Sequence, residues 1–319
     1  LVDAAGWPWI FYVNVPLGIV GLILAWINIP RLEQTNRHFD WPGVVLSAAG
    51  MFFLVFGIQE GQHFGWDWHV WAFIAAGLVA MAAFFRWQAR QGDNALVPLG
   101  LFGDRNFSLA GLTISTVGFA VSTFAIPWMI YVQTAEEYSP TRAALLILPS
   151  GIVSGVLSPY VGKLTNSHDP KPFAIAGLAL ASASIGASAL ITDPGIDPRW
   201  MYLVSVFYGV ANAMMWGPLS MIATRNLDRS LAGAGSSVYN TTRQIGAVIG
   251  SAAMAAMMSS QLERHLGAGA AGQMTGPLPA PLQEPFAQAM SNSILLPCVV
   301  LALGALAACF FAKTKSWND

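Results

Sequence analysis

Apolar residues in this 319-residue sequence fall in blocks of about 20, and short polar stretches separate the blocks. A helix rises about 1.5 Å per residue, so about 20 residues cover the roughly 30 Å of hydrocarbon in a bilayer. The blocks therefore predict nine membrane-spanning helices: Trp9–Asn28, Trp41–Gln59, Trp68–Phe85, Leu109–Val132, Ala143–Val161, Phe173–Ile191, Trp200–Ala223, Ala232–Met258 and Ile294–Phe311.

The amino-acid composition excludes an ordinary soluble domain. Hydrophobic residues make up 55% of the chain and charged residues 10%, whereas a soluble domain carries about 25% charged residues. Aromatic residues such as Trp9, Trp41, Trp68 and Trp200 stand at block ends, which is typical of helices that end among lipid headgroups. The predicted fold class is an all-α polytopic membrane protein with about nine transmembrane helices.

The positions of the basic residues predict the orientation. Of the 15 Lys and Arg residues, eleven fall in alternate connections and the C-terminal tail, three fall in the other connections, and Arg243 lies inside a block. Lys and Arg concentrate in cytoplasmic loops, so the first group is expected to be cytoplasmic. Two longer connections, Arg86–Asn106 and Gln261–Asn292, are rich in Gly and Pro and are expected to be a linker and an irregular external loop.

Proline and glycine residues interrupt several predicted spans. Membrane helices tolerate such breaks because neighbouring helices satisfy the freed backbone groups, and glycines four residues apart, as in GIVSG and GAVIG, let another helix approach closely. The alternative is ordinary packing without a gating role. The candidates for gating or packing are Pro149, Gly151, Gly155, Pro159, Gly162, Pro218, Gly246 and Gly250.

Arg243 is the most informative single residue, because a cation at membrane depth is costly unless it faces the bundle interior or water. At helical spacing it shares a polar stripe with Ser236, Asn240, Gln244 and Ala247. A role in gating or helix contact, with the side chain extended to the surface or bound to carbonyl groups, is one interpretation. Direct contact with a transported molecule is the other.

Aromatic and polar side chains beside the breaks are candidates for lining a cavity. Trp128, Asn212 and Trp216 stand next to prolines or glycines, and aromatic rings can bind flat or cationic organic molecules. The alternative is that they face lipid or neighbouring helices. With Arg243, Asn240 and Gln244, they complete the predicted set of cavity residues.

Several kinds of chemistry have no support in the sequence. The five histidines lie in or next to polar connections and lack metal-site spacing, no phosphate-binding loop occurs, and no nucleophile stands at a recognisable distance from a histidine. No basic tract suggests nucleic acid. We therefore expect no catalytic residues, no metal and no cofactor.

Four segments carry a resemblance to a known family. WPWIFYVNVPLGIVG at the start, FDWPGVVLSAAGM, LVPLGLFGDRNF and AGAGSSVYNTTRQIGAVIGSA resemble segments of the fourteen-span drug:proton antiporters (QacA and EmrB type) of the major facilitator superfamily. The first segment resembles the signature W-R-W-I-F-x-x-N-x-P-x-G, although Pro8 replaces the arginine. GKLTNSHDPK is similar to a degenerate form of the family's gating motif, with Asn166 in place of the acid.

The resemblance implies a partial major facilitator fold that lacks roughly the first five spans. Residues 1–30 would hold the last helix of the N-terminal bundle, residues 31–106 two inserted linking helices and a cytoplasmic linker, and residues 107–319 the C-terminal six-helix bundle. The family's proton-carrying acid and antiporter motif would lie before Leu1. The location implied is the cell membrane, of the bacterial inner-membrane kind.

The function implied by the resemblance is proton-coupled efflux of hydrophobic or cationic small molecules, not enzymatic catalysis. A small-molecule substrate, protons and the lipid bilayer would be the partners, and nucleic acid would not be one. Two alternatives stay open: an exporter of an endogenous lipid, siderophore or metabolite, and a truncated remnant that does not transport.

Overall fold

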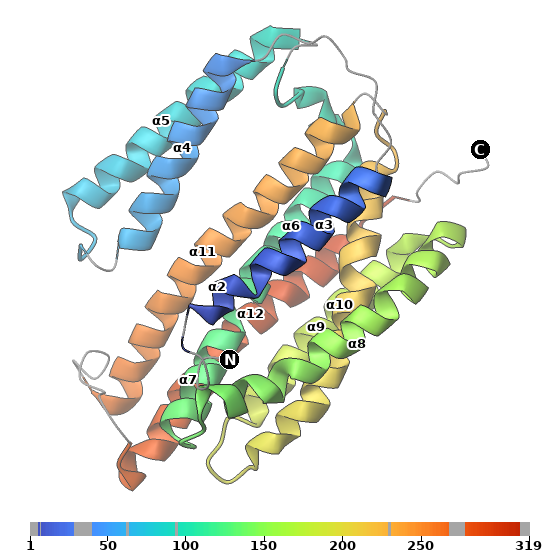
Figure 1. Cartoon of the computed structure of the whole chain (residues 1–319). Helices are drawn as coiled ribbons and strands as arrows, with labels where there is room; N and C mark the ends of the chain where they lie inside the picture. Colours follow the sequence, from blue (N-terminus) through green and yellow to red (C-terminus); the bar gives the residue numbers. More distant parts are fainter. Residues whose placement is uncertain are drawn as a thin grey trace.

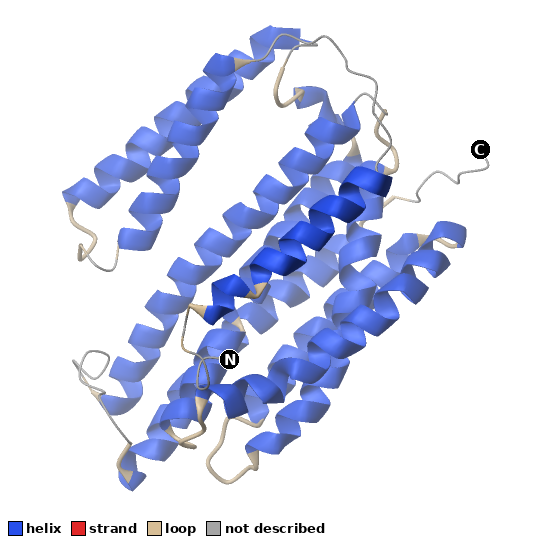
Figure 2. Ribbon diagram, in the orientation of Figure 1, coloured by secondary structure: helices blue, strands red, loops and turns tan. Residues whose placement is uncertain are grey.

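The computed structural model describes residues 6, 8–28, 40–61, 64–92, 95–228, 231–267 and 278–312, and all regular structure in these ranges is helical (Figure 2). Eight helical segments are long and apolar enough to cross a membrane, which confirms the predicted fold class. They are α4 (Trp41–Glu60), α5 (Trp68–Gln91), α6 with α7 (Arg105–Thr123 and Ala125–Thr134), α8 (Pro140–Ser167), α9 (Pro170–Leu190), α10 (Met201–Thr224), α11 (Ala232–Leu266) and α12 (Ala280–Cys309).

The short elements complete the chain. The expected first span is divided into α2 (Trp9–Tyr12) and α3 (Asn14–Asn28), and no residue of α3 is buried. Two 3₁₀ helices, η2 (Leu99–Gly103) and η3 (Pro198–Trp200), precede α6 and α10. The proposed division of the chain at residues 30 and 106 stays a prediction.

Helices α6 to α12 form one bundle, and α4 and α5 form a hairpin on its α11 side (Figure 1). In the bundle, α6 packs against α11 and α12, whereas α10 packs against α8 and α9. The hairpin touches α11, where the Gln59 amide nitrogen donates a hydrogen bond to the Ser251 hydroxyl at 3.3 Å. The chain thus contains one extensive bundle and a smaller pair of helices.

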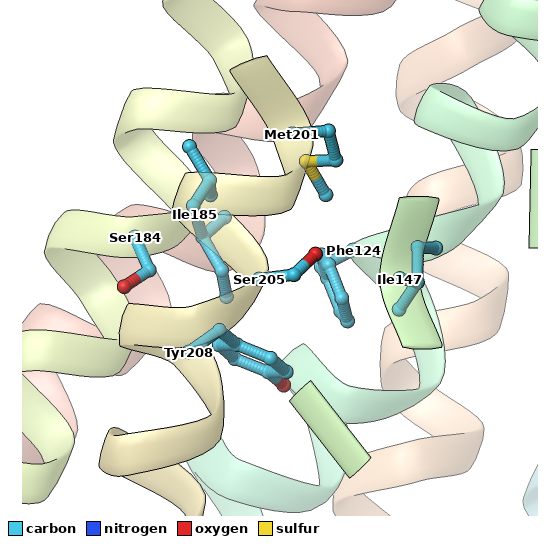
Figure 3. Close-up of a pocket in the computed structure, with 8 residues that line it drawn as sticks. Phe124, Ile147, Ser184, Ile185, Met201, Ser205 and Tyr208 are labelled. Atoms are coloured by element: carbon cyan, nitrogen blue, oxygen red, sulfur yellow. The ribbon is translucent and has the colours of Figure 1, made fainter. Parts of the chain in front are cut away.

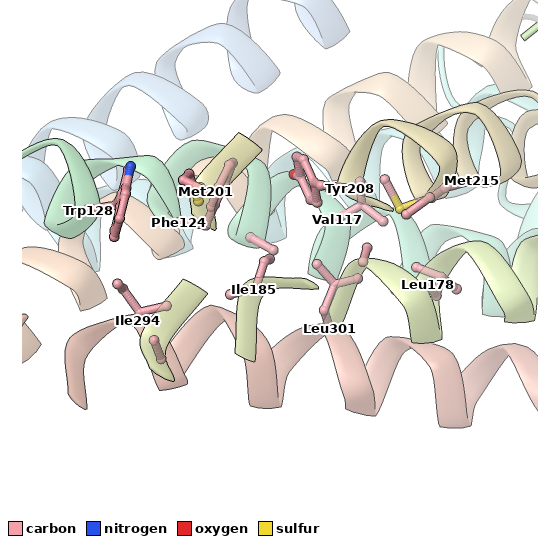
Figure 4. Packing of buried hydrophobic residues seen from close by; sticks show 14 of the residues in the cluster. Val117, Phe124, Trp128, Leu178, Ile185, Met201, Tyr208, Met215, Ile294 and Leu301 are labelled. Atoms are coloured by element: carbon pink, nitrogen blue, oxygen red, sulfur yellow. The ribbon is translucent and has the colours of Figure 1, made fainter. Parts of the chain in front are cut away.

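The hydrophobic core lies inside the bundle. Figure 4 shows side chains from different helices that point toward one another, among them Val117 of α6, Ile185 of α9, Met215 of α10 and Leu301 of α12. These residues are buried almost completely. In a bilayer such contacts stabilise the bundle through close packing rather than through removal of apolar surface from water.

The expected irregular loop at 261–292 is wrong at both of its ends, because α11 continues to Leu266 and α12 begins at Ala280. Polar residues at the two ends of this segment bond to each other between the two helices. The Asn292 amide nitrogen lies 3.3 Å from Oε1 of Gln261 and 3.2 Å from Nε2 of His265. Residues 268–277 of the expected loop lie outside the described residues.

The expected linker at 86–106 is also shorter than predicted, because α5 continues to Gln91 and α6 begins at Arg105. Asp40, which caps the start of α4, explains this extension. Its carboxylate accepts hydrogen bonds from Trp87 Nε1 at 2.8 Å, Gln88 Nε2 at 2.7 Å and the Gly43 backbone at 2.9 Å. Gln88 in turn accepts a bond from the Val97 backbone at 3.0 Å. We call these groups the Asp40 clamp, which joins α4, α5 and the segment that follows α5.

The crossing of α6 and α11 depends on glycine. A Cβ atom on Gly118 would overlap the carbonyl oxygen of Arg243, and one on Gly246 would overlap that of Ser115. A Cβ on Gly250 would lie 2.9 Å from the Phe119 Cα. The two backbones are therefore in direct contact, as small residues permit in membrane helices.

We predict that Gly246→Ala destabilises the bundle by about 1–3 kcal/mol, because the new methyl group must push α6 away from α11. Gly155→Ala in α8 is the matched control, since a Cβ there meets no atom within 4 Å. The control should gain about 0.5–1 kcal/mol from its better helix propensity. Thermal unfolding in detergent measures both effects. Equal shifts of the unfolding temperature in Gly246→Ala and Gly155→Ala would contradict the close contact between α6 and α11.

We predict a pH-dependent role for Asp40. Burial acts to raise the pKa of its carboxyl group, but hydrogen bonds from Trp87, Gly43 and Gln88 outweigh it and hold the pKa below the ordinary value of 3.8. The ionised form therefore stabilises the folded state above that value, and the stabilisation is lost as the pH falls through the lowered pKa. Asp40→Asn should unfold at a lower temperature than the parent at pH 7, and this difference should shrink at pH 3.

The exposed Asp228→Asn provides the control for Asp40→Asn. It should match the parent at both pH values. A difference between Asp40→Asn and the parent that is as large at pH 3 as at pH 7 would show that the carboxylate charge does not hold the clamp.

Candidate functional site

The centre of the candidate site is Arg243, about a third of the way along the 35 residues of α11. Its side chain is half-buried, and its guanidinium carbon lies 5.9 Å from the ring centroid of Trp216 on α10. That distance is at the outer limit for attraction between a cation and an aromatic face. The structure therefore places the guanidinium group of Arg243 beside an aromatic ring of a neighbouring helix.

Hydrogen bonds along α10 fix the orientation of this ring. Trp216 Nε1 donates to Oδ1 of Asn212 at 2.9 Å, and Nδ2 of Asn212 donates to the backbone carbonyl of Tyr208 at 2.8 Å. Asn212 and Trp216 are one helical turn apart on α10, and Arg243 lies opposite them on α11. The geometry therefore brings together three of the six predicted cavity residues. We call Arg243, Trp216 and Asn212 the Arg243 group.

Asn240 and Gln244 lie on the exposed part of α11 on either side of Arg243. The Asn240 amide nitrogen donates to the Ser236 backbone carbonyl at 2.9 Å, which leaves its amide oxygen available as an acceptor. The polar stripe predicted from the sequence is therefore open rather than covered by the described helices.

Trp128 lies apart from this group. It is fully buried in the hydrophobic core, with its ring centroid 5.9 Å from that of Tyr131. Its indole nitrogen has no hydrogen-bond partner among the described residues. In this conformation Trp128 packs the core near the join of α6 and α7 and lines no open space.

The same join borders a small internal void, shown in Figure 3. Phe124, between α6 and α7, approaches Ile147 of α8 and Tyr208 of α10 there, and the space holds no water-sized volume. The hydroxyl of Ser205 donates to the Leu146 carbonyl at 2.7 Å. The interior of the bundle is thus closed at this level.

The proline and glycine candidates fall into two sets. Gly246 and Gly250 lie in the crossing of α6 and α11, and Pro218 is buried in α10. The candidates in α8 are packed less closely. Gly151, Gly155 and Pro159 are exposed, and Pro149 and Gly162 are half-buried. A Cβ on any of the three α8 glycines would meet no atom within 4 Å. Their gating role stays a prediction.

Two residues that the sequence did not indicate hold the end of α12. The buried Asn106 donates to the Ala312 carbonyl at 3.1 Å and accepts from the Ala312 backbone nitrogen at 2.8 Å. The Lys171 ammonium group donates to the Phe311 carbonyl at 2.7 Å. Both lie in segments that resemble the family, LFGDRNF and GKLTNSHDPK, but no local sequence pattern indicates the carbonyl groups that they bind. In the ranges that the structure describes, no three His, Cys, Asp or Glu residues group as metal ligands.

The fold and this group define a polytopic α-helical membrane protein whose bundle presents polar and aromatic residues on facing helices. The family model described as Major Facilitator Superfamily matches residues 41–251. The chain belongs to the Major Facilitator Superfamily.

Curated relatives agree with this assignment. The chain is 45% identical to the uncharacterized MFS-type transporter Rv1250 of Mycobacterium tuberculosis, over 97% of this chain and 55% of the relative. It is 32% identical to the multidrug resistance protein Stp of the same species, over 83% of this chain and 50% of the relative. It is 28% identical to the putative multidrug resistance protein MdtD of Pectobacterium atrosepticum, over 78% of this chain and 53% of the relative. The chain spans about half the length of these relatives.

We predict that Asn212 and Trp216 are energetically coupled. A double-mutant cycle of Asn212→Leu and Trp216→Phe, measured as the free energy of unfolding in detergent, should give a coupling of about 1 kcal/mol, the usual net contribution of one hydrogen bond. Combining Asn212→Leu with Trp200→Phe, an exposed tryptophan before α10, should give no coupling. If the effects of Asn212→Leu and Trp216→Phe on the free energy of unfolding were additive, they would contradict the hydrogen bond between these two side chains.

Proposed function

We propose that the protein exports hydrophobic or cationic small molecules through the membrane by alternating access, coupled to protons, as in the fourteen-span drug:proton antiporters. The observation that carries the proposal is the Arg243 group, in which a cation at membrane depth faces a tryptophan of another helix. Ionisable residues within membrane helices are rare, face the bundle interior or water, and mark substrate or ion pathways. Relatives named as multidrug resistance proteins support the substrate class.

The arrangement of the Arg243 group suits exchange of ligands. The hydrogen bond to Asn212 fixes the Trp216 ring, so the ring presents its face in one orientation to a ligand or to the guanidinium group. A flat apolar molecule can stack on that face, and an organic cation competes for it with the guanidinium group. A displaced Arg243 can turn toward the open stripe that contains Asn240 and Gln244.

The proposed coupling to protons rests on the family alone. The carboxylates of the described helices lie in terminal turns, as Glu60 and Glu263 do, or within the first two turns, as Glu284 does. Arg243 is therefore proposed to respond to the substrate, and the proton is proposed to bind elsewhere in the transporter.

We predict that Arg243→Gln lowers export of the organic cation ethidium at least tenfold in everted membrane vesicles, because the uncharged variant cannot displace the substrate cation from the Trp216 ring and therefore cannot release it. Arg264→Gln, at the exposed end of the same helix, should keep the parent's rate. A protonophore that collapses the pH gradient should abolish transport by the parent.

The outcomes of this experiment separate the parts of the proposal. Ethidium export at the same rate with and without the pH gradient would refute coupling to protons. Equal rates for Arg243→Gln and Arg264→Gln would remove the Arg243 group from the transport pathway. If the protein exported an endogenous metabolite but no ethidium, the proposed multidrug substrate class would be wrong and the metabolite would take its place.

A further inference from the structure

A second candidate site lies at the end of the α4–α5 hairpin where α4 stops and α5 begins, away from the Asp40 clamp. A cavity of about 370 Å³ opens there, a size within the range of small-molecule sites. Neither helix contributes a residue to the Arg243 group. Three aromatic and three polar residues give the cavity its chemistry: Phe56, Phe64, Phe73, Glu60, Asp67 and His69.

The local backbone gives this cavity a defined shape. Gly57 lets the two helices approach closely, since a Cβ there would lie 2.9 Å from Ile74 Cγ1. Beyond it, Gly65 and Trp66 both adopt positive φ angles, 59° and 56°, and turn the chain back. The Trp66 backbone nitrogen donates to the Gly61 carbonyl at 2.8 Å, and its ring packs on Gly61. A non-glycine residue holds a positive φ only when its surroundings fix it.

The charge of the cavity is negative. Asp67 accepts bonds from His69 Nδ1 at 2.7 Å and from the His69 backbone at 2.9 Å, and the side-chain bond from His69 lowers the pKa of Asp67. Glu60 adds a second carboxylate, which forms no ion pair with any residue in the described ranges. Charge complementarity therefore favours a cation.

The aromatic residues favour a cation that carries apolar groups. The Phe56 and Phe73 rings meet edge to face with centroids 5.1 Å apart, and ring faces attract quaternary ammonium groups. Phe64, which lines the cavity, is exposed by 47%, and Trp68 and Trp71 in the first turn of α5 are exposed by 70% and 58%. Exposed tryptophans at a helix end mark the lipid headgroup level, so a ligand can enter from the bilayer interface.

We propose that this cavity binds the head of an amphiphilic alkylammonium cation from the bilayer interface, with Glu60 as its counter-charge and Phe56, Phe64 and Phe73 around its methyl groups. Asp67 serves mainly to order the loop through His69. The site is separate from the proposed transport pathway, so binding there can be tested without a transport assay.

The test uses the 319-residue chain in nanodiscs of phosphatidylglycerol, a lipid without an amine, and radiolabelled dodecyltrimethylammonium as the probe. The parent should show saturable binding at one site. Glu60→Gln should weaken the affinity about tenfold, because the counter-charge is lost. Phe73→Leu, which keeps an apolar wall without a π face, should weaken it about threefold.

Glu263→Gln is the matched control, because Glu263 is an exposed carboxylate near the end of α11. It should bind like the parent, and all variants should unfold at the parent's temperature. Competition by added phosphatidylethanolamine would support the site and identify a lipid amine as its occupant, whereas no competition would assign it to free cations. Unsaturable binding, or equal affinities for Glu60→Gln and Glu263→Gln, would falsify the proposal.

Discussion

The direct backbone contact between α6 and α11 is the constraint on which the candidate site depends. Gly118 lies against the carbonyl oxygen of Arg243 itself, so the crossing fixes the depth and the rotation of α11 at its one basic residue away from the helix ends. Membrane helices gain little from the hydrophobic effect against each other and depend on close packing instead. The position of the guanidinium group opposite Trp216 therefore follows from glycines that carry no chemistry of their own.

Much of the fold could be predicted because span length and hydropathy are local properties. The helix ends were harder to predict. The Gly- and Pro-rich composition of residues 261–292 indicated a loop, but Gln261 and Asn292 at its ends lie in two helices and bond to each other. The Asp40 clamp joins residues 47 and 48 positions apart, and no local pattern reports such a contact. Gly43, Gly50 and Gly57 do recur every seven residues on the buried side of α4, and this spacing is a local signal of the hairpin contact.

The candidate site was predictable as separate residues but not as a group. The cost of a charge at membrane depth singled out Arg243, and nearby proline and glycine singled out Trp216 and Asn212. Which aromatic residues face one another depends on how helices rotate when they pack. Trp128 met the same criteria as Trp216, yet it fills the core, because ring size and apolar surface suit an interior as well as they suit a cavity.

The bonds at the end of α12 have a mechanical consequence. Asn106 and Lys171 tie α6 and α9 to the carbonyl groups of Ala312 and Phe311, directly after α12, so three helices are joined at one end of the bundle. Toward the other end, α6 gives way to α7 at Phe124, and Pro127 lies within α7 without a backbone donor. Helices α11 and α12 are also bonded there, through Asn292, Gln261 and His265. Bending is therefore expected within the segment that runs from α6 into α7 rather than across the whole bundle.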